Sequence, residues 1–100
     1  MAWKLSPIFR YTVVGNSMEP TFFEDDKVLV NRLAYLFKKP KVGDIVVVKH
    51  SGYTDRSIIK RVKNVKGSKF FLVGDNISNS TDSRHFGEIS EEYVVGKVVI

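Results

Sequence analysis

The sequence predicts a mainly β domain, built as a small folded-over antiparallel sheet or a partly closed barrel. Short runs rich in β-branched and aromatic residues recur between turn signals along the chain. Its 100 residues, 43% of them hydrophobic, suit one domain with a single modest core. No internal repeat, low-complexity tract or linker divides the chain. We therefore expect residues 1–100 to form one domain.

Six runs are expected to form the strands of this sheet. They span residues 10–14, 27–32, 44–49, 57–65, 69–73 and 93–100. Clusters of glycine, asparagine, serine and proline separate them, because these residues favour turns. The clusters lie at Gly15-Asn16, residues 40–44, Ser51-Gly52 and Lys66-Gly67.

Two connecting segments carry expectations of their own. Residues 31–39 place Leu33, Leu36 and Phe37 at near-helical spacing, which predicts one short helical turn that Pro40 ends. Residues 74–87 are too many for a hairpin turn and too polar for a core strand. Their Asn, Asp and hydroxyl side chains can bond the local backbone, so this segment is either a rigid self-bonded loop or a functional one.

Composition excludes some classes of site and leaves others open. Cysteine is absent, so neither a disulfide nor a thiolate metal site supports the fold, and the redox compartment stays undecided. His50 and His85 lack metal-ligand spacing, and we expect no metal and no cofactor. The net charge of +5 would help binding to acidic lipid or nucleic acid, but surface lysines more often serve solubility.

The apolar runs are strand-sized, well below the roughly 18 residues of a membrane-spanning helix. As written, the chain is therefore not expected to cross a bilayer. Its first ten residues lack the apolar segment of a secretory signal peptide. Trp3, Leu5, Ile8 and Phe9 suit either packing on the core or contact with a membrane surface.

Ser17 and Lys60 are the candidate nucleophile and base. Ser17 follows a β-like run and a Gly-Asn pair, a context that can hold a hydroxyl in a tight turn. A serine needs a neighbouring base, which is a histidine or a lysine kept neutral by burial. Strand alternation would place Lys60 on the apolar face of Ile58 and Val62, where burial lowers a lysine pKa. An exposed lysine on an edge strand is the alternative.

Three motifs resemble those of type I signal peptidases. Residues 15–21, Gly-Asn-Ser-Met-Glu-Pro-Thr, resemble the nucleophile box, in which a serine precedes methionine, any residue, proline and threonine. Lys60-Arg61-Val62 resembles the general-base box, and residues 74–87 resemble the last box. A Gly43-Asp44 turn, which the family also tends to carry, lies between the first two boxes. The resemblance spans about residues 13–87.

The resemblance implies a β-rich catalytic domain that acts as a serine endopeptidase. Ser17 would attack a peptide carbonyl, and Lys60 would accept its proton and later pass it to the leaving amine. The oxyanion would bind backbone N–H groups of Ser17 and Gly15, because Gly15 stands where some members place a serine. The lysine at position 60 favours the bacterial or organellar type of signal peptidase. The endoplasmic-reticulum and archaeal types carry a histidine at the equivalent position.

Supporting roles follow from the same resemblance. Ser80 would hydrogen-bond to Lys60 and orient it, and Asp82 would form an ion pair with Arg84. The resemblance further pairs Asp75 with Arg61 and puts Met18 and Pro20 at the substrate groove.

The implied substrate is a precursor protein that loses an N-terminal signal or pro-segment, cut after small residues. The chain also resembles the small soluble proteases that mature nickel superoxide dismutase. A cytoplasmic location is expected if the chain is complete, and a membrane-anchored catalytic domain outside the cytoplasm if an anchor precedes it.

Two other functions fit parts of the sequence. A self-cleaving protein of the LexA kind would share a serine-lysine dyad on a related fold. A basic β-barrel that binds nucleic acid would stack bases on aromatic side chains. Those candidates are Tyr11, Phe22, Phe23, Tyr53, Phe70 and Phe71.

Overall fold

The computed structural model describes residues 7–49 and 56–100. Expectations for Trp3, Leu5, His50, Tyr53 and the Ser51-Gly52 turn lie outside these residues.

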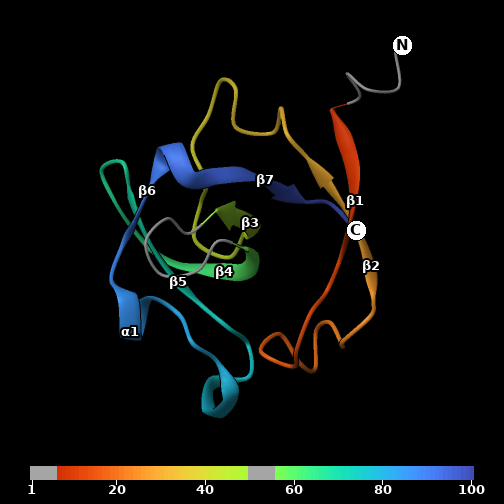
Figure 1. Cartoon of the computed structure of the whole chain (residues 1–100). Coiled ribbons are helices and arrows are strands. Elements are labelled where there is room, and N and C mark those ends of the chain that lie inside the picture. The colour runs from red at the N-terminus through yellow and green to blue at the C-terminus, as the bar shows by residue number, and fades with distance from the viewer. Residues whose placement is uncertain (1–6, 50–55) are drawn as a thin grey trace.

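One antiparallel sheet makes up the molecule (Figure 1). Its strands are β1 (Ile8–Thr12), β2 (Lys27–Asn31), β3 (Ile45–Lys49), β4 (Ser57–Lys66), β5 (Lys69–Val73), β6 (Ile89–Ser90) and β7 (Val94–Val98). The order is β1-β2-β7-β3-β4-β5-β6, so β1 and β6 are the edges and the described sheet does not close. Figure 1 shows it folded over, with β1 and β2 on one side and β5 and β6 on the other. The mainly β, folded-over sheet is confirmed, whereas closure into a barrel is not observed.

Short helical turns lie in the second half of the chain. They are η2 (Ile77–Asn79), α1 (Ser83–Phe86) and η3 (Glu91–Tyr93). The sequence did not predict α1, which Asp82 begins by accepting a hydrogen bond from the Arg84 N–H. None of the helices in the described residues could span a membrane.

The helical turn expected within residues 31–39 is not formed. This segment makes hydrogen-bonded turns instead, with the Leu36 N–H donating to the Leu33 carbonyl at 3.1 Å. The Asn31 side chain accepts from the Leu33 N–H at 2.9 Å, which closes a local Asx turn. The Tyr35 hydroxyl donates to Asp44 at 2.8 Å and draws the segment back onto the sheet.

Strand β4 lies inside the sheet, between β3 and β5. Its side chains alternate between two core clusters: Ile59 belongs to one, and Ile58 and Val62 pack in the other. Lys60 pairs with Val46 of β3 in the middle of this arrangement. Only 5% of the surface of Lys60 is exposed, so the alternative of an exposed lysine is excluded.

Candidate active site

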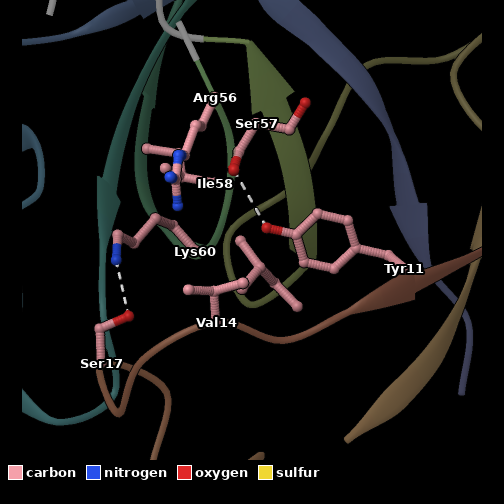
Figure 2. Close-up of a pocket in the computed structure, with 8 residues that line it drawn as sticks. Tyr11, Val14, Ser17, Arg56, Ser57, Ile58 and Lys60 are labelled. Carbon is pink, nitrogen blue, oxygen red and sulfur yellow. Dashed lines mark hydrogen bonds between the residues drawn. The ribbon is translucent and has the colours of Figure 1, made fainter. Parts of the chain in front are cut away.

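Ser17 and Lys60, 43 residues apart in the sequence, meet at one end of β4. The Lys60 Nζ lies 2.7 Å from the Ser17 Oγ. Figure 2 shows the lysine reaching from its strand to the serine, which lies on the loop that follows β1. At this distance an uncharged amine can accept the hydroxyl proton through its nitrogen lone pair.

Burial favours the uncharged form of the Lys60 amine. Only 5% of the surface of Lys60 is exposed. Loss of hydration lowers the pKa of Lys60 below its ordinary value, and the positive charge of Arg84 lowers it further. The Asp82 carboxylate raises the pKa of Lys60 and so opposes both. Desolvation is the largest of the three effects, so the lysine loses its proton more readily than a solvated lysine does.

The loop that carries Ser17 is a series of tight turns. Gly15 has φ +80°, a left-handed conformation that favours glycine. The Glu19 N–H donates to the Asn16 carbonyl at 3.2 Å, which closes a turn around the serine. Neither the Ser17 N–H nor the Gly15 N–H donates to an acceptor within residues 7–49 and 56–100.

The segment that follows β5 packs against this loop. The Asn76 side chain donates from Nδ2 to the Asn16 carbonyl at 3.0 Å, and its backbone N–H donates to the Ser17 carbonyl at 2.8 Å. A side chain at Gly74 would overlap Ser80 and approach the Ser17 carbonyl to 2.6 Å. Asn76 lies within residues 74–87, for which the motif assigns no role to this amide, because nothing in the pattern indicates which backbone atoms an amide will meet.

Asp75 links a residue next to Lys60 with a residue of the turns that follow Ser17. Arg61, next to Lys60, donates to it through Nε at 2.8 Å and Nη2 at 2.9 Å. Thr21, in the turns after Ser17, donates its hydroxyl to the same carboxylate at 2.5 Å. The hydrogen bond from Arg61 lowers the pKa of Asp75, so the ion pair persists at neutral pH.

Asp82 is fully buried, and its carboxylate accepts several hydrogen bonds. It accepts from the Gly74 N–H at 2.9 Å, the Ser80 hydroxyl at 2.7 Å and the Arg84 Nε at 2.8 Å. Burial by itself would raise the pKa of Asp82, but these hydrogen bonds hold it well below its ordinary value. The carboxylate therefore keeps its negative charge near Lys60.

The expectation for Ser80 needs correction. Its hydroxyl donates to Asp82, and the described residues show no hydrogen bond between Ser80 and Lys60. A buried carboxylate is the stronger acceptor, and it lies two residues away on the same loop.

A small cavity of about 140 Å³ adjoins the dyad. The residues that line it are Tyr11, Val14, Ser17, Arg56, Ser57, Ile58, Ile59 and Lys60. In Figure 2 the Tyr11 hydroxyl reaches the Ser57 carbonyl, a hydrogen bond of 3.1 Å. The cavity thus lies between residues 11–14, which precede the serine, and residues 56–59, which precede the lysine.

Met18 and Pro20, which were expected at the substrate groove, do not line this cavity. Met18 is fully buried in the core cluster with Val13, because its apolar side chain gains more from burial than from exposure at a rim. Pro20 is exposed on the turn that follows.

The other candidate functions find less support. His85 is exposed and its Nδ1 accepts the Asp82 N–H at 3.3 Å, which occupies it as part of the α1 cap. The described residues contain no group of three or more potential metal ligands. Phe70 is fully buried, and Tyr11 and Phe22 pack against the core, so these aromatic side chains offer no continuous stacking surface.

Comparisons with known proteins agree with the motifs. The sequence matches the family model described as signal peptidase, peptidase S26, over residues 2–69 and 63–100. It is 33% identical over 104 residues to mitochondrial inner membrane protease subunit 1 of Mus musculus, which covers 84% of this chain and 63% of the mouse protein. It is 31% identical over 139 residues to signal peptidase I V of Bacillus subtilis (strain 168), which covers 88% of this chain and 82% of that protein. The chain spans less than two thirds of the mouse protein's length.

Proposed function

The chain belongs to the S26 signal peptidase family, and from that membership we propose that it is a serine endopeptidase with Ser17 as nucleophile and Lys60 as general base. One observation carries the assignment of the two roles. The Lys60 Nζ and the Ser17 Oγ lie 2.7 Å apart, with the lysine almost wholly buried. A lysine in this setting gives up its charge more readily than one in water, and a base must be uncharged to accept a proton.

The reaction proceeds through an acyl-enzyme. Lys60 takes the hydroxyl proton as the Ser17 Oγ bonds to the scissile carbonyl carbon. The lysine then returns that proton to the leaving amine as the peptide C–N bond breaks. Water attacks the resulting ester with Lys60 again as base, which releases the new carboxyl end and restores the serine.

The negative charge that develops on the carbonyl oxygen needs donors. The backbone N–H groups of Ser17 and Gly15 have no acceptor among the described residues, which supports them as candidates. Preorganised donors of this kind typically lower the barrier by about 3 to 4 kcal/mol.

An extended peptide can pair with residues 57–60 of β4, which have no strand partner on the β5 side among the described residues. Residues 57–60 pair with β3, whereas pairing with β5 begins at Arg61. The Val62 N–H donates to the Asp44 carbonyl on the β3 side, so by alternation the backbone groups of Ile59 face the unpaired side. A substrate strand that adds to this edge would bring its carbonyl to the dyad.

The cavity beside Ser17 and Lys60, about 140 Å³ in volume, has room for a small side chain next to the cut. We propose that the substrate is a precursor protein that loses an N-terminal signal or pro-segment, with small residues such as alanine before the scissile bond.

Cleavage of defined peptides tests this function. Purified protein is incubated with peptides that differ in the residue before the cut, and products are identified by mass spectrometry. Cleavage after alanine by the wild type, but not by Ser17→Ala, supports the proposal. Equal cleavage by both proteins would contradict it. A shortened enzyme chain in the absence of peptide would instead indicate self-cleavage.

A further inference from the structure

Asn76 bonds to both peptide groups that flank the Cα of Ser17. Its Nδ2 donates to the Asn16 carbonyl at 3.0 Å, and its N–H donates to the Ser17 carbonyl at 2.8 Å. The two partners lie 60 and 59 positions earlier in the sequence. Asn76, in the segment that follows β5, therefore bonds to the backbone on both sides of Ser17.

The first of these bonds helps to set the direction of the Ser17 N–H, together with the Glu19 N–H, which donates to the same Asn16 oxygen at 3.2 Å. The peptide bond between Asn16 and Ser17 is trans. In a planar trans peptide group the carbonyl and the following N–H point in opposite directions. A donor that holds the Asn16 oxygen therefore aims the Ser17 N–H away from Asn76, where it is available to a substrate oxygen.

The second bond fixes the next peptide group. When the planes on both sides of a residue are held, its φ and ψ are set, and the direction of its Cβ follows. The hydroxyl of Ser17 is then directed by the same residue that directs its N–H. This matters because the Ser17 Oγ must stay within reach of the Lys60 Nζ, 2.7 Å away.

The backbone of Asn76 is located by contacts other than its own side chain. Gly74 lies so close to the Ser17 carbonyl that a Cβ there would be 2.6 Å away. Asp75 is held by two hydrogen bonds from Arg61, at 2.8 and 2.9 Å. Replacing the Asn76 amide should therefore remove its bond to Asn16 and leave the bond from its backbone N–H.

We propose that Asn76 is a positioning residue, which orients the oxyanion donor of Ser17 by holding the opposite end of the same peptide plane. This inference rests on the proposed function. Asn76 itself need not touch the substrate, since its effect is transmitted through the Asn16 carbonyl.

Two variants and a matched control test the role. Asn76→Ala removes the amide, and Asn76→Asp keeps its shape but replaces the donor with an acceptor. We expect both to lower kcat about tenfold with KM changed by less than about twofold, a smaller loss than removing an oxyanion donor outright. Asn79→Ala is the control, because Asn79 is an exposed asparagine of the same loop whose backbone N–H remains.

A peptide aldehyde separates positioning from a structural role. It adds to the serine and places an oxyanion where the tetrahedral intermediate would have one, whereas the matching peptide acid does not. The aldehyde should bind Asn76→Ala about tenfold more weakly than wild type and the acid equally well, with unfolding monitored by circular dichroism.

Equal losses for aldehyde and acid, or an Asn76→Ala variant that matches Asn79→Ala, would overturn the inference and leave the function standing. Retention of full kcat by Asn76→Asp would also overturn it. A wild-type protein that cleaves no peptide and binds no aldehyde would overturn the proposed function, and this inference with it.

Discussion

The Lys60 amine approaches the Ser17 hydroxyl to 2.7 Å from an interior strand, while the serine lies on a loop after the edge strand β1. Strands β1 and β4 are not neighbours in the sheet, so the contact between the two side chains depends on the fold as a whole.

Ser17→Ala and Lys60→Ala should each lower kcat/KM by on the order of a thousandfold or more, because the nucleophile and its base act as one unit. The double variant should be no worse than either single one. Ser78→Ala is the control, since Ser78 is an exposed serine of η2. Substantial turnover by either dyad variant, with a native circular dichroism spectrum, would refute the assigned roles.

The pH profile should report the titration of Lys60. Activity requires the uncharged amine, and burial lowers the pKa of Lys60 below 10.5. We expect kcat/KM to rise with pH through an apparent pKa below 10.5, which stopped-time peptide assays can measure. Asp82→Asn removes a negative charge that raises this pKa, so its profile should shift to lower pH. A rise centred at or above 10.5 would contradict the assignment.

Asp82 should contribute stability that depends on pH. Its pKa in the folded protein is held below the ordinary 3.8, so this stability is present above pH 3.8 and is lost as the pH falls toward the folded pKa. At neutral pH, Asp82→Ala should cost roughly 3 kcal/mol, because it leaves buried donors without an acceptor. Urea unfolding at pH 7 and pH 3 measures both effects. If the difference between wild type and variant is the same at the two values, the linkage is absent.

The Arg61–Asp75 pair should show coupling in a double-mutant cycle. Arg61→Ala and Asp75→Ala each break the same bidentate contact, so their effects on the free energy of unfolding should not add. The side chain of Arg61 is 34% exposed, which limits the coupling to about 1 kcal/mol. Chemical denaturation of the four proteins measures it, and strictly additive losses would show that the pair contributes nothing of its own.

Tyr11 should limit the size of the side chain that the cavity accepts. Tyr11→Ala removes one wall and should raise the ratio of cleavage after valine to cleavage after alanine several-fold. Tyr11→Phe keeps the ring and loses only the hydrogen bond to Ser57, so it serves as the control. Because Tyr11 also packs against the core, the ratio is measured below the melting temperature of each variant. An unchanged ratio in Tyr11→Ala would exclude this role.

Much of the sheet could be predicted from local pattern. The run at 69–73 was predicted with the bounds that β5 has, and the alternation around Lys60 separated Ile59 from Ile58 and Val62 as the two core clusters do. Strand β6 has two residues, too few to show any periodicity. Its existence depends on pairing with β5, which is a tertiary contact.

The contact between the two candidate residues could be predicted from the sequence, and the contacts around them less so. Ser17 and Lys60 lie in motifs, so their proximity could be expected, and their side chains lie 2.7 Å apart. The Ser80 hydroxyl could in principle serve either Lys60 or Asp82, and the choice depends on the conformation of a loop that the Asp82 cap determines. Met18 shows the same limit, because sequence proximity to the serine does not indicate whether a side chain points outward or into the core.

Hydrogen exchange at residues 57–60 of β4 should report whether a peptide is bound beside this strand. Among the described residues the amide proton of Ile59 has no strand partner, and Ile59 lines the cavity, so this proton should exchange with deuterium faster than those of Ile58 and Lys60, which are bonded across to β3. A bound peptide would slow exchange at Ile59 selectively. Binding could therefore be followed residue by residue in an inactive enzyme, without any cleavage event.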